Sequence, residues 1–145
     1  MPTLWTIGYE RLLPPELVAE LETAGVARVI DVRFRPQSRR PGMSKTRLGE
    51  LLGAHGIAYE HRKALGTPPD LRHDFHAGRV EQARTAYRKH VENAAPEALD
   101  ELAAELRDGP RTALLCLEAD PAGCHRRVLC EALAERVAGL KVVDL

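Results

Sequence analysis

The sequence lacks the features of a membrane protein or of a broad nucleic-acid binder. It has 145 residues, only six aromatics among Phe, Tyr and Trp, and 21 basic residues that cancel 21 acidic ones. A chain without net charge has no overall field to attract nucleic acid or a membrane surface. Proteins that bind single strands also stack bases on exposed aromatic side chains, which are scarce here. Any attraction to an anion therefore has to be local.

No apolar run approaches the ~20 residues that cross a bilayer, and residues 1–5 do not resemble a signal peptide. The three cysteines, Cys116, Cys124 and Cys130, form no Cys-x-x-Cys pair of the kind that structural zinc sites use. Together with Cys116 and Cys124, His125 would be a suitable metal donor, and Glu118 or His61 could complete the set. Without close pairing, however, we expect no metal and no cofactor. We also expect a cytoplasmic protein with reduced thiols and no membrane partner. The oligomeric state is not predicted.

The alternation of apolar and amphipathic segments predicts a single α/β domain over residues 1–145. The expected strands are residues 4–7, 28–32, 57–61, 112–117 and 140–143, and the clearest helical patterns are residues 14–24, 44–55 and 125–137. Strands that alternate with helices form parallel sheets covered on both faces. We therefore expect a three-layer, mainly parallel five-stranded sheet with an all-helical insertion over residues 70–108, before the fourth strand.

Ligands of such sheets bind at the carboxyl ends of the strands. There, His61 is a candidate acid or base, and the alternative is that it only caps a strand end. The residues that we expect to line one cleft at this edge are Tyr9, Asp31, Arg33, Arg39, His61, Glu118, Cys124, His125 and Arg126.

Residues 114–127 are the most informative segment. An apolar run ends at Glu118, residues 120–123 (Asp-Pro-Ala-Gly) have the signature of a type I turn, and a helix is expected to begin near Cys124. The start of a helix stabilises a thiolate or a bound anion, so Cys124 is a candidate nucleophile. Glu118 or His125 would transfer protons. The alternative is that Cys124 is a small buried apolar residue, as most free cysteines are.

The spacing excludes a cysteine phosphatase loop, which needs an arginine six residues after its cysteine. The sixth residue after Cys116 is Ala122, and the sixth after Cys124 is Cys130. Phosphate ester chemistry of that kind is therefore not expected.

A basic segment lies between Val32 and Gly49, without one acidic residue. It contains Arg33, Arg35, Arg39, Arg40, Lys45 and Arg47. The arginine fork suits phosphate or carboxylate, so we expect Arg33 and Arg39 to bind an anion. Arg126 would join them, because a cation at a helix start opposes the helix dipole and needs a partner. The alternatives are a solvated basic loop and, for Arg126, an internal ion pair.

Several ordered motifs resemble those of a bacterial and archaeal family called domain of unknown function 488, in its short single-domain form. They are Thr6-Ile7-Gly8-Tyr9-Glu10, Asp31-Val32-Arg33, Pro41-Gly42-Met43-Ser44-Lys45, Leu65-Gly66, Cys116-Leu117-Glu118 and Cys124-His125-Arg126. The resemblance implies a compact α/β protein but no settled reaction, and some relatives carry a DNA-repair label. Many members have a histidine where this chain has Tyr9, which could still donate a hydrogen bond.

Three functional interpretations follow. The leading one is a small enzyme that acts on a phosphate-bearing substrate, a nucleotide or a nucleic-acid end. The second is a non-catalytic module that binds an anionic ligand, RNA or DNA through the same residues. In the third, the charges are structural, and Asp31 and Glu118 neutralise Arg33 and Arg126. Carboxylates, a thiol and an imidazole at one edge favour the enzyme.

Overall fold

The computed structural model describes residues 2–145, so Met1, which the expected domain includes, lies outside the described residues. Its five strands are β1 (Thr3–Gly8), β2 (Arg28–Asp31), β3 (Ala58–His61), β4 (Thr112–Cys116) and β5 (Lys141–Asp144). They form one sheet in the order β3-β2-β4-β1-β5, and every neighbouring pair is parallel. The predicted parallel five-stranded sheet is confirmed, and each predicted strand end lies within one residue of the observed end.

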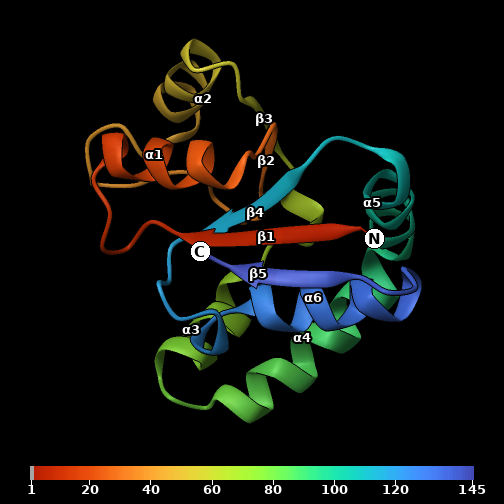
Figure 1. Cartoon of the computed structure of the whole chain (residues 1–145). Helices are drawn as coiled ribbons and strands as arrows, with labels where there is room; N and C mark the ends of the chain where they lie inside the picture. Colours follow the sequence, from red (N-terminus) through yellow and green to blue (C-terminus); the bar gives the residue numbers. More distant parts are fainter. Residues whose placement is uncertain (1) are drawn as a thin grey trace.

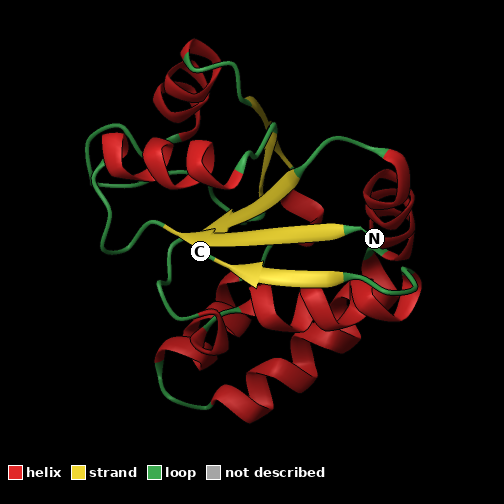
Figure 2. Ribbon diagram, in the orientation of Figure 1, coloured by secondary structure: helices red, strands yellow, loops and turns green. Residues whose placement is uncertain are grey.

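Helices cover both faces of this sheet (Figures 1 and 2). They are α1 (Pro14–Ala24), α2 (Lys45–Ala54), α3 (Pro69–His76), α4 (Val80–Ala94), α5 (Pro96–Asp108) and α6 (His125–Arg136), with the short 3₁₀ turns η1 (Lys63–Leu65) and η2 (Pro121–Gly123). α1 and α2 pack on one face, and α4, α5 and α6 on the other. The predicted helical insertion before the fourth strand is confirmed as α3, α4 and α5. None of the helices within residues 2–145 has the length and apolarity needed to cross a membrane.

The position of each strand in the sheet explains its sequence. All five residues of β4 are buried, because β4 lies between β2 and β1 and has helices on both sides. A strand in this position reads as a continuous apolar run. β3 and β5 form the two edges and contain exposed residues, so their patterns in the sequence are weaker.

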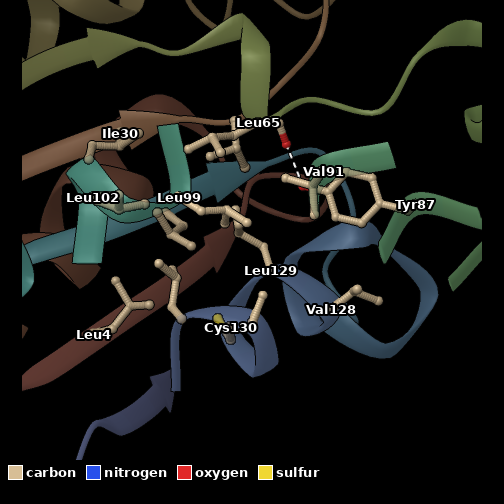
Figure 3. Packing of buried hydrophobic residues seen from close by; sticks show 14 of the residues in the cluster. Leu4, Ile30, Leu65, Tyr87, Val91, Leu99, Leu102, Val128, Leu129 and Cys130 are labelled. Atoms are coloured by element: carbon tan, nitrogen blue, oxygen red, sulfur yellow. Dashed lines mark hydrogen bonds between the residues drawn. The ribbon is translucent and has the colours of Figure 1, made fainter. Parts of the chain in front are cut away.

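The core consists of two apolar clusters, one on each face of the sheet. Figure 3 shows the cluster under α4, α5 and α6, to which Leu4 and Ile30 of the strands and Leu129 of α6 belong. Tyr87 of α4 is fully buried there, and its hydroxyl donates a hydrogen bond of 2.6 Å to the carbonyl oxygen of Leu65. The bond satisfies the one polar atom of that side chain inside the core.

The connections after β2 and β4 diverge. The chain leaves β2 toward α2 on one face of the sheet and leaves β4 toward α6 on the other face. Between adjacent parallel strands, such a divergence opens a crevice at the carboxyl ends, which is where ligands bind in sheets of this type. The fold thus places the candidate site between β2 and β4.

Glu105 of α5 forms salt bridges that connect the helical insertion to the sheet. It lies 2.6 Å from Arg28 at the start of β2 and 2.6 Å from Arg62 after β3. The hydrogen bonds from Arg62 lower the pKa of Glu105 most, and with those from Arg28 they outweigh the effect of burial and bring it to about 2. The carboxylate is therefore ionised throughout the ordinary pH range.

We expect Glu105→Gln to lower the free energy of unfolding by about 2 kcal/mol near neutral pH, because the substitution removes the negative charge that lies between the two arginines. Folding lowers the pKa of Glu105, so the carboxylate stabilises the fold fully above its unfolded pKa of about 4.3. That contribution is lost as the pH falls toward about 2. Urea denaturation should show the difference between wild type and variant shrinking as the solution becomes more acidic.

The matched control is Glu101→Gln, because Glu101 is an exposed residue on the same helix. It should change the free energy of unfolding by less than about 0.5 kcal/mol. Equal effects of the two substitutions, or a difference that stays constant in acid, would contradict the role of Glu105.

Candidate functional site

A small pocket lies at the divergence of β2 and β4. We name it the thiol pocket; it is lined by Arg33, Phe34, Thr67, Arg72, Phe75, Cys116, Leu117, Glu118, Cys124 and His125. Its volume of about 20 Å³ holds one water-sized group. An adjoining space of about 260 Å³, the outer cleft, shares Phe34, Thr67 and Arg72 with it. The remaining residues of the outer cleft are Arg35, Pro69, His73 and His76.

Local sequence places Cys124 at the start of α6. The Asp120 side chain accepts a hydrogen bond of 2.9 Å from the backbone N–H of Ala122, which supports the 3₁₀ turn over Pro121–Gly123. The next residue, Cys124, has an extended backbone and is the N-cap of α6. Its Sγ accepts from the backbone N–H of Arg126 at 3.4 Å, in the position that a capping oxygen usually occupies. The predicted helix start near Cys124 is confirmed.

His125 is positioned to exchange a proton with this thiol. Its Nε2 lies 2.8 Å from the carbonyl oxygen of Val32, so Nε2 carries a proton and donates it there. Nδ1 then faces Cys124 Sγ at 3.5 Å. Burial lowers the pKa of His125, but the negative charge of Cys124 and the bond to Val32 more than offset this and raise it. The pair therefore favours a thiolate beside an imidazolium.

Cys116, at the end of β4, supplies a second thiol. Its Sγ lies 2.7 Å from the Sγ of Cys124, and both side chains are buried. Burial raises the pKa of Cys124, but the hydrogen bond from Cys116 and the charge of His125 outweigh burial and lower it to about 5. Burial and the neighbouring Cys124 raise the pKa of Cys116 well above its usual value. The negative charge thus resides on Cys124 and the proton on Cys116.

Arg126 carries a buried positive charge behind the two sulfurs. Its side chain is 1% exposed and donates to Thr6 Oγ1 at 3.1 Å and to the carbonyl oxygens of Glu118 at 2.6 Å and Ala119 at 3.4 Å. All these acceptors are uncharged. Burial lowers the pKa of Arg126, but its electrostatic interactions with Cys116 and Cys124 outweigh burial and raise the pKa above the ordinary value. A thiolate at Cys124 therefore compensates part of the guanidinium charge.

Arg33 is also bonded inside the protein. Its guanidinium lies 2.7 Å from the fully buried Asp31 carboxylate and donates to the Tyr9 hydroxyl at 3.2 Å and to the Met43 carbonyl at 2.7 Å. His61 Nε2 lies 2.7 Å from the carbonyl oxygen of Arg33 and fixes the same loop. These contacts match the structural alternative for Asp31 and Arg33, in which the two charges neutralise each other.

The structure brings four of the nine expected site residues into the lining of the thiol pocket, namely Arg33, Glu118, Cys124 and His125. Tyr9, Asp31 and Arg126 are buried beneath it, His61 supports the β2 loop, and Arg39 is exposed on the basic segment. Fewer residues thus line the pocket than the sequence predicts, because several of the polar side chains at this edge are bonded to partners inside the protein.

Among the residues of α3 that line the site, Arg72 and His76 have interactions that the sequence does not predict. Arg72 lines both the thiol pocket and the outer cleft, and within residues 2–145 its guanidinium has no hydrogen-bond or ion-pair partner. His76 Nε2 lies 3.1 Å from Glu118 Oε1. Burial raises the pKa of Glu118, but the bond to His76 and further contacts lower it overall. No spacing relates α3 to the strands; only the tertiary fold places this helix at the pocket.

The ligand atoms of Cys116, Glu118 and Cys124 lie within 4.8 Å of one another, and zinc accepts all three residue types. Two thiolates on a tetrahedral zinc, at Zn–S distances of about 2.3 Å, are separated by about 3.8 Å. The 2.7 Å between the sulfurs is too short for two ligands of one zinc ion. The expectation that the protein binds no metal stays a prediction.

Gly8, the last residue of β1, determines how closely the loop after β4 can approach. A Cβ atom at this position would overlap the carbonyl oxygen of Glu118, the atom to which Arg126 donates. We expect Gly8→Ala to lower the free energy of unfolding by about 2–3 kcal/mol, measured by urea denaturation. Gly53→Ala in α2 is the control, because no atom lies within 4 Å of its Cβ position. A helical alanine there should stabilise the protein by about 0.5–1 kcal/mol; similar losses at both positions would contradict the close approach.

The ionisation of Cys124 can be followed by the ultraviolet absorbance of the thiolate. We expect this absorbance to persist in the folded protein until the pH falls to about 5. Cys124→Ser should abolish the step, whereas Cys130→Ser should retain it, because burial raises the pKa of Cys130 to about 12. A wild-type titration with its first step near the ordinary thiol pKa of about 8.5 would show that Cys124 is not activated.

A comparison with protein families gives one result. The model of the family described as Domain of unknown function DUF488 matches residues 14–133, which extend from the start of α1 into α6 and include both pocket cysteines. No curated protein and no solved structure matches the chain significantly. The match covers well over half of the sequence and agrees with the motifs after β2 and β4, and the chain therefore belongs to the DUF488 family.

Proposed function

We propose that this protein is a small thiol-dependent enzyme in which Cys124 is the nucleophile. The observation that carries the proposal is the Cys124–His125 pair at the start of α6, which lines a pocket together with Arg72, an arginine that has no side-chain partner among residues 2–145. A thiol becomes a strong nucleophile when a neighbouring imidazole takes its proton and a helix N-terminus stabilises the thiolate. Cys124 has both of these neighbours.

The substrate is proposed to carry a phosphate or a similar anionic group. The thiol pocket admits only a small reacting end, so the rest of the molecule would occupy the outer cleft. Arg72 and Arg35 line that cleft, whereas the guanidiniums of Arg33 and Arg126 are engaged by internal acceptors. An arginine fork binds phosphate in two parallel hydrogen bonds. We therefore assign the direct anion contact to Arg72, and a supporting contact to Arg35.

In this proposal the phosphate is bound for recognition and does not react, because the arginine of a phosphatase loop is missing. The Cys124 thiolate attacks an electrophilic atom of the substrate and forms a covalent thiol-linked intermediate. The bond to the leaving group breaks, and the imidazolium of His125 donates its Nδ1 proton to that group. Water then attacks the same substrate atom. Its oxygen bonds to that atom as the bond to Cys124 Sγ breaks, and its proton passes to Nδ1 of His125, so that the thiolate and the imidazolium are restored.

The proposal predicts selective alkylation of Cys124. Iodoacetamide should modify this cysteine before Cys130, and inorganic phosphate or a nucleoside monophosphate should slow the modification several-fold by occupying the outer cleft. Arg72→Ala should abolish most of the protection, because it removes the guanidinium to which the anion contact is assigned. Mass spectrometry of the digested protein identifies the modified cysteine and gives the rate.

Arg107→Ala is the control for Arg72→Ala, since Arg107 lies in the last turn of α5 and outside both cavities. Chloride at matched ionic strength is the control for the anion, because screening acts on both variants alike. If phosphate protects the two variants equally, Arg72 is not the anion site. If Cys130 is alkylated as fast as Cys124, the nucleophile assignment fails.

The basic segment supports a second candidate function, the binding of a nucleic acid. Four of its cations are exposed, namely Arg35, Arg39, Lys45 and Arg47. Arg40, in contrast, is bonded to the backbone carbonyl groups of Glu10 and Leu12 and holds the segment against the loop after β1. Protection of Cys124 by an oligonucleotide but not by phosphate or mononucleotide would favour this candidate. Such binding would weaken steeply with salt.

A further inference from the structure

The proposed reaction uses one thiol, but the pocket contains two. Cys116 Sγ lies 2.7 Å from Cys124 Sγ, and both residues line the thiol pocket. A hydroxyl group could hydrogen-bond a thiolate equally well, so the second sulfur is not explained by activation alone. The third cysteine, Cys130, is buried and does not belong to the pocket lining. The chain thus holds one closely spaced dithiol and one separate thiol.

We propose that Cys116 and Cys124 are a peroxide-reactive dithiol, which a small hydroperoxide such as hydrogen peroxide converts reversibly into a disulfide. This inference shares the Cys124 thiolate with the proposed function and does not depend on the anionic substrate. The two sulfurs lie at the ends of rigid elements, β4 and α6, and would approach by only about 0.7 Å to reach a disulfide bond of about 2.05 Å.

The size of the thiol pocket limits which oxidant can react. About 20 Å³ accommodates a molecule little larger than water, and hydrogen peroxide has this size. A bulky disulfide such as oxidised glutathione does not fit without movement of α3, whose residues Arg72 and Phe75 line the pocket. The geometry therefore favours a small hydroperoxide over exchange with a large disulfide.

In the first step, the Cys124 thiolate attacks one oxygen of hydrogen peroxide, and an S–O bond forms as the O–O bond breaks. The other oxygen leaves as hydroxide and takes the Nδ1 proton of His125 to become water. Cys124 is oxidised to a sulfenic acid, and the peroxide is reduced.

In the second step, Cys116 attacks the sulfenic sulfur. Glu118 Oε2 lies 3.4 Å from Cys116 Sγ and accepts the thiol proton. The S–S bond forms as the S–O bond breaks, and the hydroxide that leaves takes up this proton from Glu118 to give a second water. Two thiols and one peroxide thus give one disulfide and two waters, and an external dithiol reductant reverses the oxidation. Oxidation removes the nucleophile, so it would also inhibit the proposed enzyme.

Counting thiols tests the inference, because the chain has three cysteines. After treatment with stoichiometric hydrogen peroxide and denaturation, we expect one free thiol per chain in place of three, and a mass lower by about 2 Da. Peptide mapping without reductant should find residues 116 and 124 linked, and dithiothreitol should restore all three thiols. Three remaining thiols, or a disulfide between chains, would overturn the inference.

Single substitutions test the role of each sulfur. Cys116→Ser should leave Cys124 as a sulfenic acid that dimedone traps, whereas Cys130→Ser should form the disulfide as wild type does. Trapping of sulfenic acid in wild type to the same extent as in Cys116→Ser would overturn the role of Cys116. Because peptide mapping uses the wild-type protein, the disulfide assignment does not depend on the folding of any variant.

The two proposals fail separately. If Cys124 is alkylated rapidly and phosphate slows the alkylation, but peroxide causes no loss of thiols, the proposed enzyme is supported and the peroxide-reactive dithiol is rejected. If the disulfide forms but neither phosphate nor nucleotide slows the alkylation, the peroxide-reactive dithiol is supported and the anionic substrate is rejected.

Discussion

The site depends on the burial of one positive charge, the guanidinium of Arg126. Its hydrogen bonds to the carbonyl oxygens of Glu118 and Ala119 hold the loop after β4 against the end of β1, where Gly8 leaves room for it. Its bond to Thr6 links it to Asp144 of the edge strand, because the Thr6 hydroxyl donates to that carboxylate. A buried cation requires nearby negative charge, and the Cys124 thiolate supplies part of it. The same arrangement thus fixes the loop and favours the ionised thiol.

A second buried pair, Asp31 and Arg33, has a different role. The fully buried Asp31 carboxylate accepts from Arg33 and from the Tyr59 hydroxyl, so ionic and hydrogen bonds hold the end of β2 in addition to apolar packing. This network orients the backbone at Val32, whose carbonyl oxygen accepts from His125. The orientation of the imidazole beside Cys124 therefore depends on the ion pair of Asp31 and Arg33. Polar residues at one edge of a sheet can belong to the framework of a site as well as to its chemistry.

Much of the fold is predictable from the sequence, because apolar runs, prolines and glycines specify local structure directly. The run over residues 112–117 and the Asp-Pro-Ala-Gly turn predict β4 and the start of α6, and these place Cys124 and His125 correctly. Which arginine is free to bind an anion is not predictable in this way. Arg33 and Arg72 have the same side chain, and only the tertiary contacts pair the first with Asp31 and leave the second without a partner among residues 2–145. The contribution of α3 depends on its packing across the pocket, for which the sequence has no local signal.

The division of the pocket between α3 and the sheet has a consequence for the selectivity of the site. The two sulfurs and the imidazole come from β4 and the start of α6, whereas Arg72, Phe75 and His76 at the entrance come from one eight-residue helix. Substitutions at Arg72 would change the charge at the entrance without replacing either sulfur or the imidazole. Under the proposed function, changes in α3 would therefore alter the selectivity of the pocket, while β4 and α6 keep the sulfurs and the imidazole in place.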